Sequence, residues 1–454
     1  MNKLKVGYAS VNINAPLGIA VYGYYVPRFA KGYLDDLEAE ALALCCDDKK
    51  IIVIAVDAGA VPADFVDECR ELIEKETGVL GANVLISASH SHTTPFLRDM
   101  DMFDYDLEPV FEYREFVKKR LLDAAKLALD DIRPARMGYI VGYAPERVAY
   151  IRRYKMKDGT TMTCPPLGDP NIDYPIGELD RRVNVLRFDR EGAESVVFVN
   201  YGLHADCIGG ELLSADWPGW MRKTVEKALE GCKCMFFAGA EGDVGSTNIN
   251  PTGGDMNDTE ISFDNEMKSP GMARFVGRAL AGTVLQVFDK VHYIDVDDIG
   301  VIHKEILIPA NLPTAEELVV AKKYKALHDA GKDEEIPFSA MELTTVVAEA
   351  ARMCKLEKGS ENFRFDLMGI KIGDVAMVGI PGEPFTEIGV ELKKAEGWVM
   401  IMPCAQTNGD EGYFPMKSAY DEGGYESRSS VFKSGVAEKI IDGGTALLDE
   451  MRKK

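Results

Sequence analysis

Histidine is scarce in this chain, which has six histidines in 454 residues. Basic residues are also few, with 52 Lys and Arg against 74 Asp and Glu, giving a formal net charge of −22. A field of this sign repels phosphate backbones and anionic lipid headgroups, so we expect no nucleic-acid partner. The scarcity of histidine makes the positions of the six informative.

Three further features are missing from the sequence. No run of about 20 apolar residues is present, so we expect no transmembrane segment. The residues after Met1 lack the apolar stretch of a secretory signal, and the nine cysteines are scattered without a C-x-x-C pair. We therefore expect reduced thiols, a cytoplasmic location and no zinc site made of cysteines.

The order of apolar runs predicts an α/β fold: one large domain of mixed β-sheets flanked by helices. With 46% hydrophobic and 28% charged residues, the chain can form a sizeable core. Residues 309–358 are rich in Ala, Glu, Lys and Leu, which predicts a helical insertion. The expected strands cover residues 50–57, 83–89, 195–201, 234–239, 364–372, 375–380 and 398–403, and the expected helices cover residues 62–76, 217–229 and 385–395.

Polar and titratable residues follow the ends of these strands. Ligands of α/β sheets bind outside the carboxyl ends of strands, so we expect a metal site there. His90 and His92 follow the second predicted strand, and in an extended chain residues two apart point to the same face. His204 and Glu241 follow two later strands, and Glu383 follows residues 375–380.

These residue types suit zinc. Two imidazoles and a carboxylate form a donor set that binds Zn²⁺ and leaves a position open for water. Glu383 has an alternative interpretation, because an acidic residue at the start of a helix stabilises the helix dipole. Asp206 and Asp216 either orient a ligand imidazole or cap a turn.

At these residues the sequence resembles the neutral, non-lysosomal ceramidases. Residues 85–95 resemble the family's T-H-T-H-S-x-P stretch, residues 241–244 its E-G-D-V-S segment, and residues 381–383 its P-G-E-F. Residues 214–216 are similar to its S-S-D. Tyr413, Tyr420 and Tyr425 have the spacing of its C-terminal tyrosine segment. The matches are in the same order and span residues 4–435.

The resemblance implies a set of site residues. One Zn²⁺ would be bound by His90, His204, Glu383 and Tyr413. The residues that contact the substrate or the transition-state oxygen would be His92, Arg152 and Tyr425. The serine of the family's G-D-V-S is Gly245 here, and the match ends near residue 431, which leaves no room for the family's C-terminal immunoglobulin-like domain.

The implied activity is zinc-dependent hydrolysis of an amide by a metal-activated water, acting on N-acyl sphingosine, as in sphingolipid metabolism, or on a smaller amide. Two alternatives remain. One is a metallohydrolase acting on an ester, a lactone or an acetylated small polar substrate, and the other is a metal-binding protein without catalysis. The pocket distinguishes the substrates, because a deep apolar groove suits an acyl chain whereas a small polar pocket suits a sugar-like or acid substrate.

Overall fold

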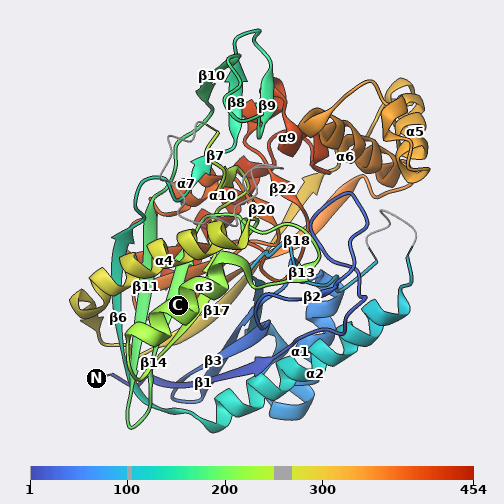
Figure 1. Ribbon diagram of the computed structural model, residues 1–454. Coiled ribbons are helices and arrows are strands. Elements are labelled where there is room, and N and C mark those ends of the chain that lie inside the picture. Colours follow the sequence, from blue (N-terminus) through green and yellow to red (C-terminus); the bar gives the residue numbers. More distant parts are fainter. Residues whose placement is uncertain (1, 100–104, 250–267, 454) are drawn as a thin grey trace.

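Two β-sheets that pack face to face form the centre of the computed structural model, which describes residues 2–99, 105–249 and 268–453 (Figure 1). The larger sheet has the order β14-β12-β11-β6-β1-β3-β4-β5, with β16 beside β6, and the smaller has the order β17-β18-β19-β21. The larger sheet is made of β1 (Lys5–Asn12), β3 (Glu38–Cys46), β4 (Lys49–Val56), β5 (Val84–Ala88), β6 (Arg133–Tyr143), β11 (Arg182–Arg190), β12 (Ser195–Tyr201), β14 (Cys232–Ala238) and β16 (His292–Ile294). The smaller sheet is made of β17 (Ile299–Pro309), β18 (Asn362–Ile372), β19 (Val375–Gly379) and β21 (Met400–Cys404).

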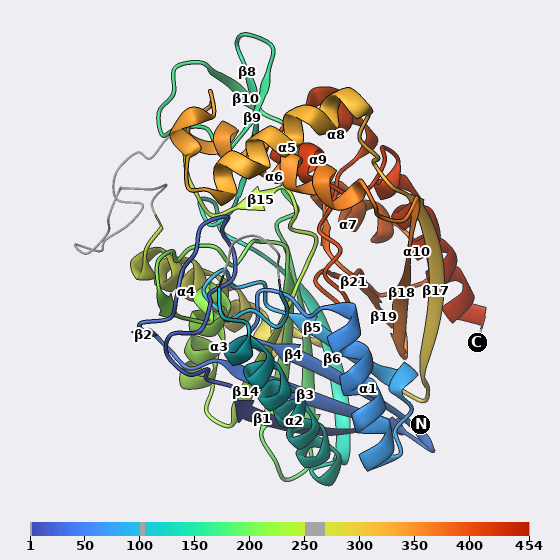
Figure 2. The same cartoon turned by 90° about the vertical axis from the view of Figure 1, so that its right-hand side faces the viewer.

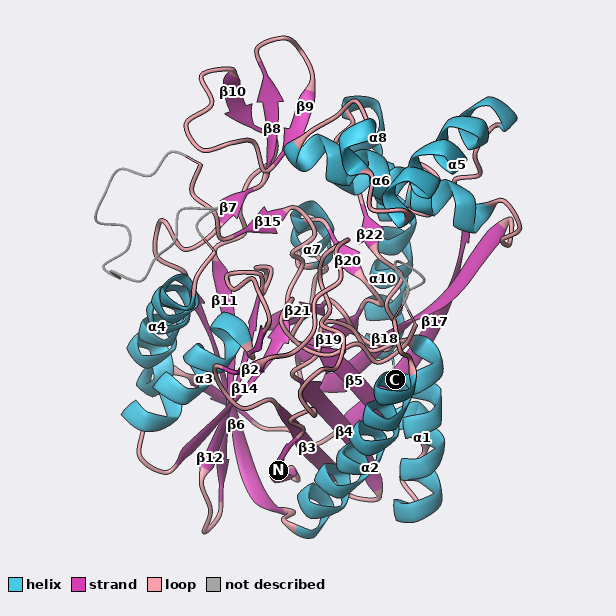
Figure 3. Ribbon diagram, turned by 45° about the vertical axis from the view of Figure 1, so that its right-hand side comes forward, coloured by secondary structure: helices cyan, strands magenta, loops and turns pink. Residues whose placement is uncertain are grey.

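Helices cover the outer faces of both sheets, giving four layers (Figures 1 and 3). The larger sheet packs on α1 (Ala63–Thr77), α2 (Glu108–Asp130), α3 (Asp216–Ala228) and α4 (Pro270–Val287), and the smaller on α7 (Thr386–Leu392) and α10 (Val436–Lys453). In β4, Ile51 and Val53 point into the core between the sheets, whereas Ile52 and Ile54 point toward the helices. Burial on both faces explains why β4 is apolar throughout rather than alternating.

Three strand pairs within these two large sheets are parallel, and they carry the predicted site. The pairs are β4 with β5, β12 with β14, and β19 with β21. The segment after β21 joins them, because Ala405 donates its N–H to the carbonyl of Ala238 (2.9 Å) and Ala88 donates to that of Gln406 (3.0 Å). The carboxyl ends of strands from both sheets therefore meet at one place.

A second group of short elements lies over this meeting point (Figure 2). Residues 309–358 contain α5 (Ala315–Asp329), which begins with a capping box at Thr314, and α6 (Ala340–Leu356). The other short elements are β2 (Gly32–Tyr33), β7 (Tyr150–Ile151), β8 (Arg153–Met156), β9 (Thr161–Thr163), β10 (Ile172–Pro175), β13 (Leu212–Leu213), β15 (Val244–Gly245), β20 (Glu383–Pro384), β22 (Tyr413–Phe414), α8 (Lys417–Glu422) and α9 (Tyr425–Ser429).

The structure confirms the predicted α/β class with mixed sheets. Each strand and helix predicted from the sequence is present within a few residues of its expected bounds, although the helix expected at 385–395 ends at Leu392. Among the residues that the structure describes, no helix has the length and apolar composition needed to cross a membrane.

A buried cation fixes α3 to the larger sheet. The guanidinium of Arg222 on α3 lies 2.5 Å from a carboxylate oxygen of Glu40 and 2.6 Å from one of Asp57, and all three side chains are almost fully buried. Removing the cation would leave two buried carboxylates without a counter-charge. This arrangement fixes the middle of α3 to β3 and to the loop that follows β4.

We expect Arg222→Ala to lower the free energy of unfolding by about 3–5 kcal/mol, because breaking a buried ion pair strands its partners. Urea denaturation followed by circular dichroism measures the change. Arg364→Ala is the matched control, since Arg364 pairs with Glu305 at the surface and should change stability little. Equal stability of the two variants would contradict the assignment.

Candidate metal centre

Three histidines from two distant parts of the sequence meet at the ends of the parallel strands. His90 and His92 follow β5, and His204 follows β12. One ring nitrogen from each lies within 4.8 Å of the others, and His90 and His204 are buried. These three histidines could therefore hold a metal ion.

The backbone places His90 in an unusual conformation. Its φ is +62°, in the left-handed region that residues other than glycine rarely adopt. Its N–H donates to the carbonyl of Ala58 (3.0 Å), and its Nδ1 donates to the carbonyl of Gly59 (2.7 Å). The loop after β4 therefore fixes the direction of the imidazole, and Nε2 is left pointing toward the other histidines.

His204 is oriented in the same manner. Its Nδ1 lies 2.8 Å from the carbonyl oxygen of Glu241 and 3.1 Å from that of Val244. Because a carbonyl only accepts hydrogen bonds, Nδ1 carries the proton and Nε2 of the neutral ring is an acceptor. A hydrogen bond from the second ring nitrogen to a backbone carbonyl is typical of metal-binding histidines.

Glu383 completes the group. Its Oε2 lies 3.0 Å from Nε2 of His204 and 3.5 Å from Nε2 of His90. The short parallel pairing of β20 with β22 places Tyr413 directly beside Glu383, and the Tyr413 ring stacks on His204 with centroids 6.4 Å apart. The structure thus brings together all four residues predicted to bind Zn²⁺.

The chemistry of this donor set fits a bound cation. Two neutral imidazole nitrogens and a carboxylate oxygen face one another, and these atoms repel unless a proton or a cation lies between them. Ligand atoms about 2.0–2.1 Å from a tetrahedral zinc lie roughly 3.3 Å apart, and Oε2 of Glu383 lies 3.0 Å from Nε2 of His204 and 3.5 Å from Nε2 of His90. Glu241 adds a carboxylate that is fully buried and whose two oxygens have no hydrogen-bond partner among the described residues.

The pKa values reflect the same demand for positive charge. Burial opposes charge on His90, but the Glu383 carboxylate more than offsets it and raises the pKa of His90 to about 9. Burial and the nearby Arg152 lower the pKa of His204 to about 4. Burial raises the pKa of Glu241 to about 8, with His90 acting in the opposite direction. Without a bound cation, protons must neutralise the buried carboxylates of Glu383 and Glu241.

His92 lies between the histidine group and Asp206. Its Nε2 is 3.4 Å from Nε2 of His90, and its Nδ1 is 3.5 Å from Oδ1 of Asp206. Tyr24 and Lys268 donate to Asp206 at 2.6 and 2.7 Å and fix it in place. Asp206 therefore lies beside an imidazole, as one of its two expected roles requires, but the ring is that of His92 and not that of a predicted metal ligand.

The contacts of Asp216 favour its second expected role, which is to cap a turn. Its carboxylate accepts hydrogen bonds from the N–H groups of Ile208 (2.9 Å) and Trp217 (2.5 Å), which caps the turn at the start of α3. Neither bond involves a histidine ring.

Arg152 and Tyr425 flank Tyr413. Nε of Arg152 lies 2.8 Å from Oε1 of the buried Glu426, and its guanidinium carbon is 5.3 Å from the ring centroid of Tyr413. The ring of Tyr425 packs edge-on against Tyr413, with centroids 5.5 Å apart. Tyr425 lines the cavity above the histidines, whereas Arg152 lies behind Tyr413.

This cavity has a volume of about 190 Å³. His90, His92, Glu383, Tyr413 and Tyr425, which line it, were predicted from the sequence, whereas its other walls were not. Those include Tyr22, Tyr24, Arg98, Lys355 and Glu411. These residues lie in irregular loops or at the end of a helix and form no motif, so only the three-dimensional structure reveals them.

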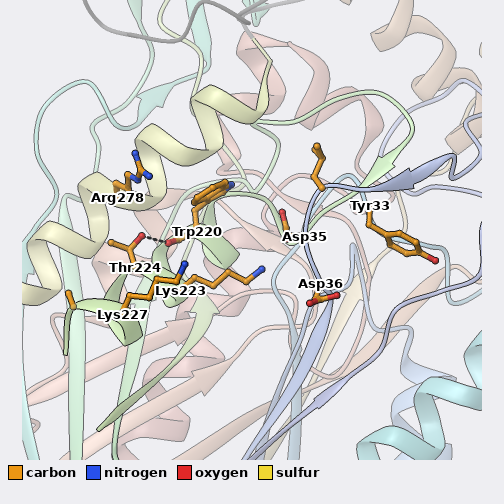
Figure 4. Close-up of a pocket in the computed structure, with 10 residues that line it drawn as sticks. Tyr33, Asp35, Asp36, Trp220, Lys223, Thr224, Lys227 and Arg278 are labelled. Atoms are coloured by element: carbon orange, nitrogen blue, oxygen red, sulfur yellow. Dashed lines mark hydrogen bonds between the residues drawn. The ribbon is translucent and has the colours of Figure 1, made fainter. Parts of the chain in front are cut away.

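A larger cavity of about 720 Å³ lies elsewhere, between residues 33–36 and helices α3 and α4 (Figure 4). Trp220, Lys223 and Arg278 line it, and none of the predicted site residues do. The carboxylate of Asp35 in this cavity already accepts hydrogen bonds from Ser214 and Ala215 at the start of α3. The titratable groups suited to catalysis therefore gather at the smaller cavity.

We expect the wild-type protein, dialysed against Zn²⁺ and then buffer, to retain about one metal ion per chain. A His90→Ala/His204→Ala double variant should retain almost none, because it loses the two imidazole donors that face Glu383. Inductively coupled plasma mass spectrometry measures the metal, and circular dichroism checks the fold. A His292→Ala/His303→Ala control should bind like the wild type, and equal metal in both double variants would contradict the assignment.

No protein-family model matches this chain, and no curated protein is found as its relative. Among solved structures, the chain is similar to neutral ceramidase from Pseudomonas aeruginosa, with a TM-score of 0.72 and 14% sequence identity over all of this chain and 75% of that one. It is also similar to a ceramidase complexed with C2, with a TM-score of 0.74 and 14% identity over all of this chain and 76% of that one. The chain therefore has the fold of the neutral ceramidases, as its ordered motifs predicted.

Proposed function

We propose that this protein is a Zn²⁺-dependent hydrolase that cleaves an amide bond. The observation that carries the proposal is the convergence of Glu383 with Nε2 of His90 and of His204, each histidine already donating its Nδ1 proton to a backbone carbonyl. Nitrogen and oxygen donors in this number suit zinc. When bound, Zn²⁺ polarises a carbonyl and lowers the pKa of a water molecule.

The residues of the chain divide into two roles in this proposal. His90, His204 and Glu383 hold the ion, with Tyr413 beside them through the β20 and β22 pairing. His92 faces the same space with Asp206 beside its Nδ1, and its Nε2 donates a hydrogen bond to the substrate carbonyl oxygen when the ring carries both protons. The surrounding burial excludes bulk water from these contacts and strengthens them.

Tyr425 supplies a second donor in the proposed mechanism. Its ring lines the cavity, and its hydroxyl shares a hydrogen bond with that of Tyr25. Arg152 is a positioning residue, because its guanidinium contacts Tyr413 and is itself held by Glu426. An amide, rather than another carbonyl compound, is supported by the shared fold with ceramidases and by the motifs they have in common.

We expect Tyr425→Phe to lower kcat by about 10²–10³-fold, because one donor to the developing oxyanion is lost. Metal content should not change. Steady-state kinetics on any hydrolysed amide measures the effect. Tyr420→Phe is the matched control from the same segment, since the Tyr420 hydroxyl donates to the carbonyl of Phe432 (2.7 Å) and should leave kcat unchanged. Equal kcat values for the two variants would remove Tyr425 from the mechanism.

A substrate screen tests the reaction class. The zinc-loaded protein is assayed with N-acyl amides of graded chain length, with lactones and acetylated sugars alongside. We expect amide hydrolysis that dialysis against a chelator abolishes and that added Zn²⁺ restores. Hydrolysis of lactones or acetylated sugars alone would replace the amide with an ester-type substrate, and metal-independent hydrolysis would overturn the mechanism.

A further inference from the structure

The cavity between residues 33–36 and helices α3 and α4 takes no part in the proposed hydrolysis. Its volume of about 720 Å³ lies within the range of roughly 300–1,000 Å³ that pockets for small ligands enclose. None of the residues predicted to hold Zn²⁺ or to contact the substrate line it. A ligand bound here would therefore be distinct from the substrate of the metal centre.

One side of α3 lines this cavity with an aromatic ring and two cations. Residues three, four and seven places apart share one side of a helix. On α3 this side presents to the cavity Trp220, Lys223, Thr224 and Lys227. The Thr224 hydroxyl donates to the carbonyl of Trp220 (2.7 Å), so it is already satisfied (Figure 4). The indole ring and the two ammonium groups remain for a ligand.

Helix α4 brings a guanidinium beside the indole. A Cβ atom at Gly277 of α4 would lie only 2.5 Å from Cβ of Trp220, so glycine allows the two helices to pack this closely. The guanidinium carbon of Arg278 then lies 5.7 Å from the centroid of the Trp220 ring. This distance is near the outer limit of about 6 Å for a cation–π contact, and Trp220 still lines the cavity.

The cations of the cavity lack ion-pair partners, whereas its carboxylates are hydrogen-bonded. Among the residues that the structure describes, no carboxylate lies within ion-pair distance of Lys223, Lys227 or Arg278. On the facing segment, Asp35 binds the start of α3, and Asp36 accepts a hydrogen bond from the side-chain amide of Asn14 (2.7 Å).

The positive charge of the helix wall acts locally. Charges in solution are screened over about 8 Å at physiological ionic strength, so these three cations decide which ion binds here more than the net charge of −22 does. Ammonium and guanidinium groups that converge beside an open aromatic ring suit a small anion that carries a planar ring.

We propose that this cavity binds a mononucleotide. Its base stacks on Trp220, because every nucleobase has a face that can stack on an aromatic side chain. Its phosphate contacts the cations of α3 and α4. Its ribose hydroxyls donate to Asp36, which has one carboxylate oxygen without a hydrogen bond among the described residues. A mononucleotide thus uses all three parts of the wall, and its binding does not depend on the proposed hydrolysis.

Calorimetry on the metal-free protein tests this proposal, because removal of Zn²⁺ prevents the phosphate from binding at the metal centre. We expect at least one of AMP, GMP, CMP and UMP to bind. The matching nucleoside lacks the phosphate and ribose 5-phosphate lacks the base, so each should bind about tenfold more weakly or worse. If the folded protein binds none of the four nucleotides, or binds ribose 5-phosphate as tightly, the proposal is wrong.

Two variants locate the bound nucleotide. Lys227→Glu/Arg278→Glu reverses two exposed charges of the cavity and should raise the Kd of the nucleotide by about tenfold or more. Trp220→Leu should raise it by about tenfold and leave ribose 5-phosphate binding unchanged. A Lys290→Glu/Lys358→Glu control, at exposed lysines outside the cavity, should leave Kd unchanged. Circular dichroism checks the fold, and equal Kd values for the charge-reversal variant and this control would overturn the assignment.

Discussion

The structure depends on one electrostatic constraint at the meeting point of the two sheets. Glu383 is buried against two imidazoles whose Nδ1 protons are already engaged by backbone carbonyls, so in the neutral rings both Nε2 lone pairs face the carboxylate. Such a group is stable only with a positive charge between its members. The left-handed backbone at His90 and the tight pairing of β20 with β22 hold this arrangement together.

The layers of the fold explain how four loops reach one point. Only the parallel pairs among the described strands of the two sheets send consecutive carboxyl ends to the same edge, and the loops with His90, His204, Glu241 and Glu383 each follow a strand of such a pair. The segment after β21 is hydrogen-bonded to both β5 and β14. The core between the sheets therefore fixes the positions of the site loops.

Strand ends were predictable from the sequence because apolar runs and the residues after them are local signals. Buried strands such as β4 and β12 are continuous apolar runs, and the polar residue that follows each is visible at once. The fold class and the positions of His90, His204 and Glu383 could be anticipated in this way, and Tyr413 through the family resemblance. Strand β6, with its arginines and glycines, gave no such signal. The remaining cavity wall was also hidden, because Arg98, Lys355 and Glu411 line the same cavity only through tertiary packing.

Two parts of the chain build the cavity. The candidate donors lie at strand ends that the double sheet holds, whereas Lys355 lies on a helical hairpin attached by Arg428 and His328. A change of length or charge in residues 309–358 would thus change one wall of the cavity without moving the histidines. Proteins that share the strand-end residues but differ in this hairpin would present differently shaped cavities around the same donors.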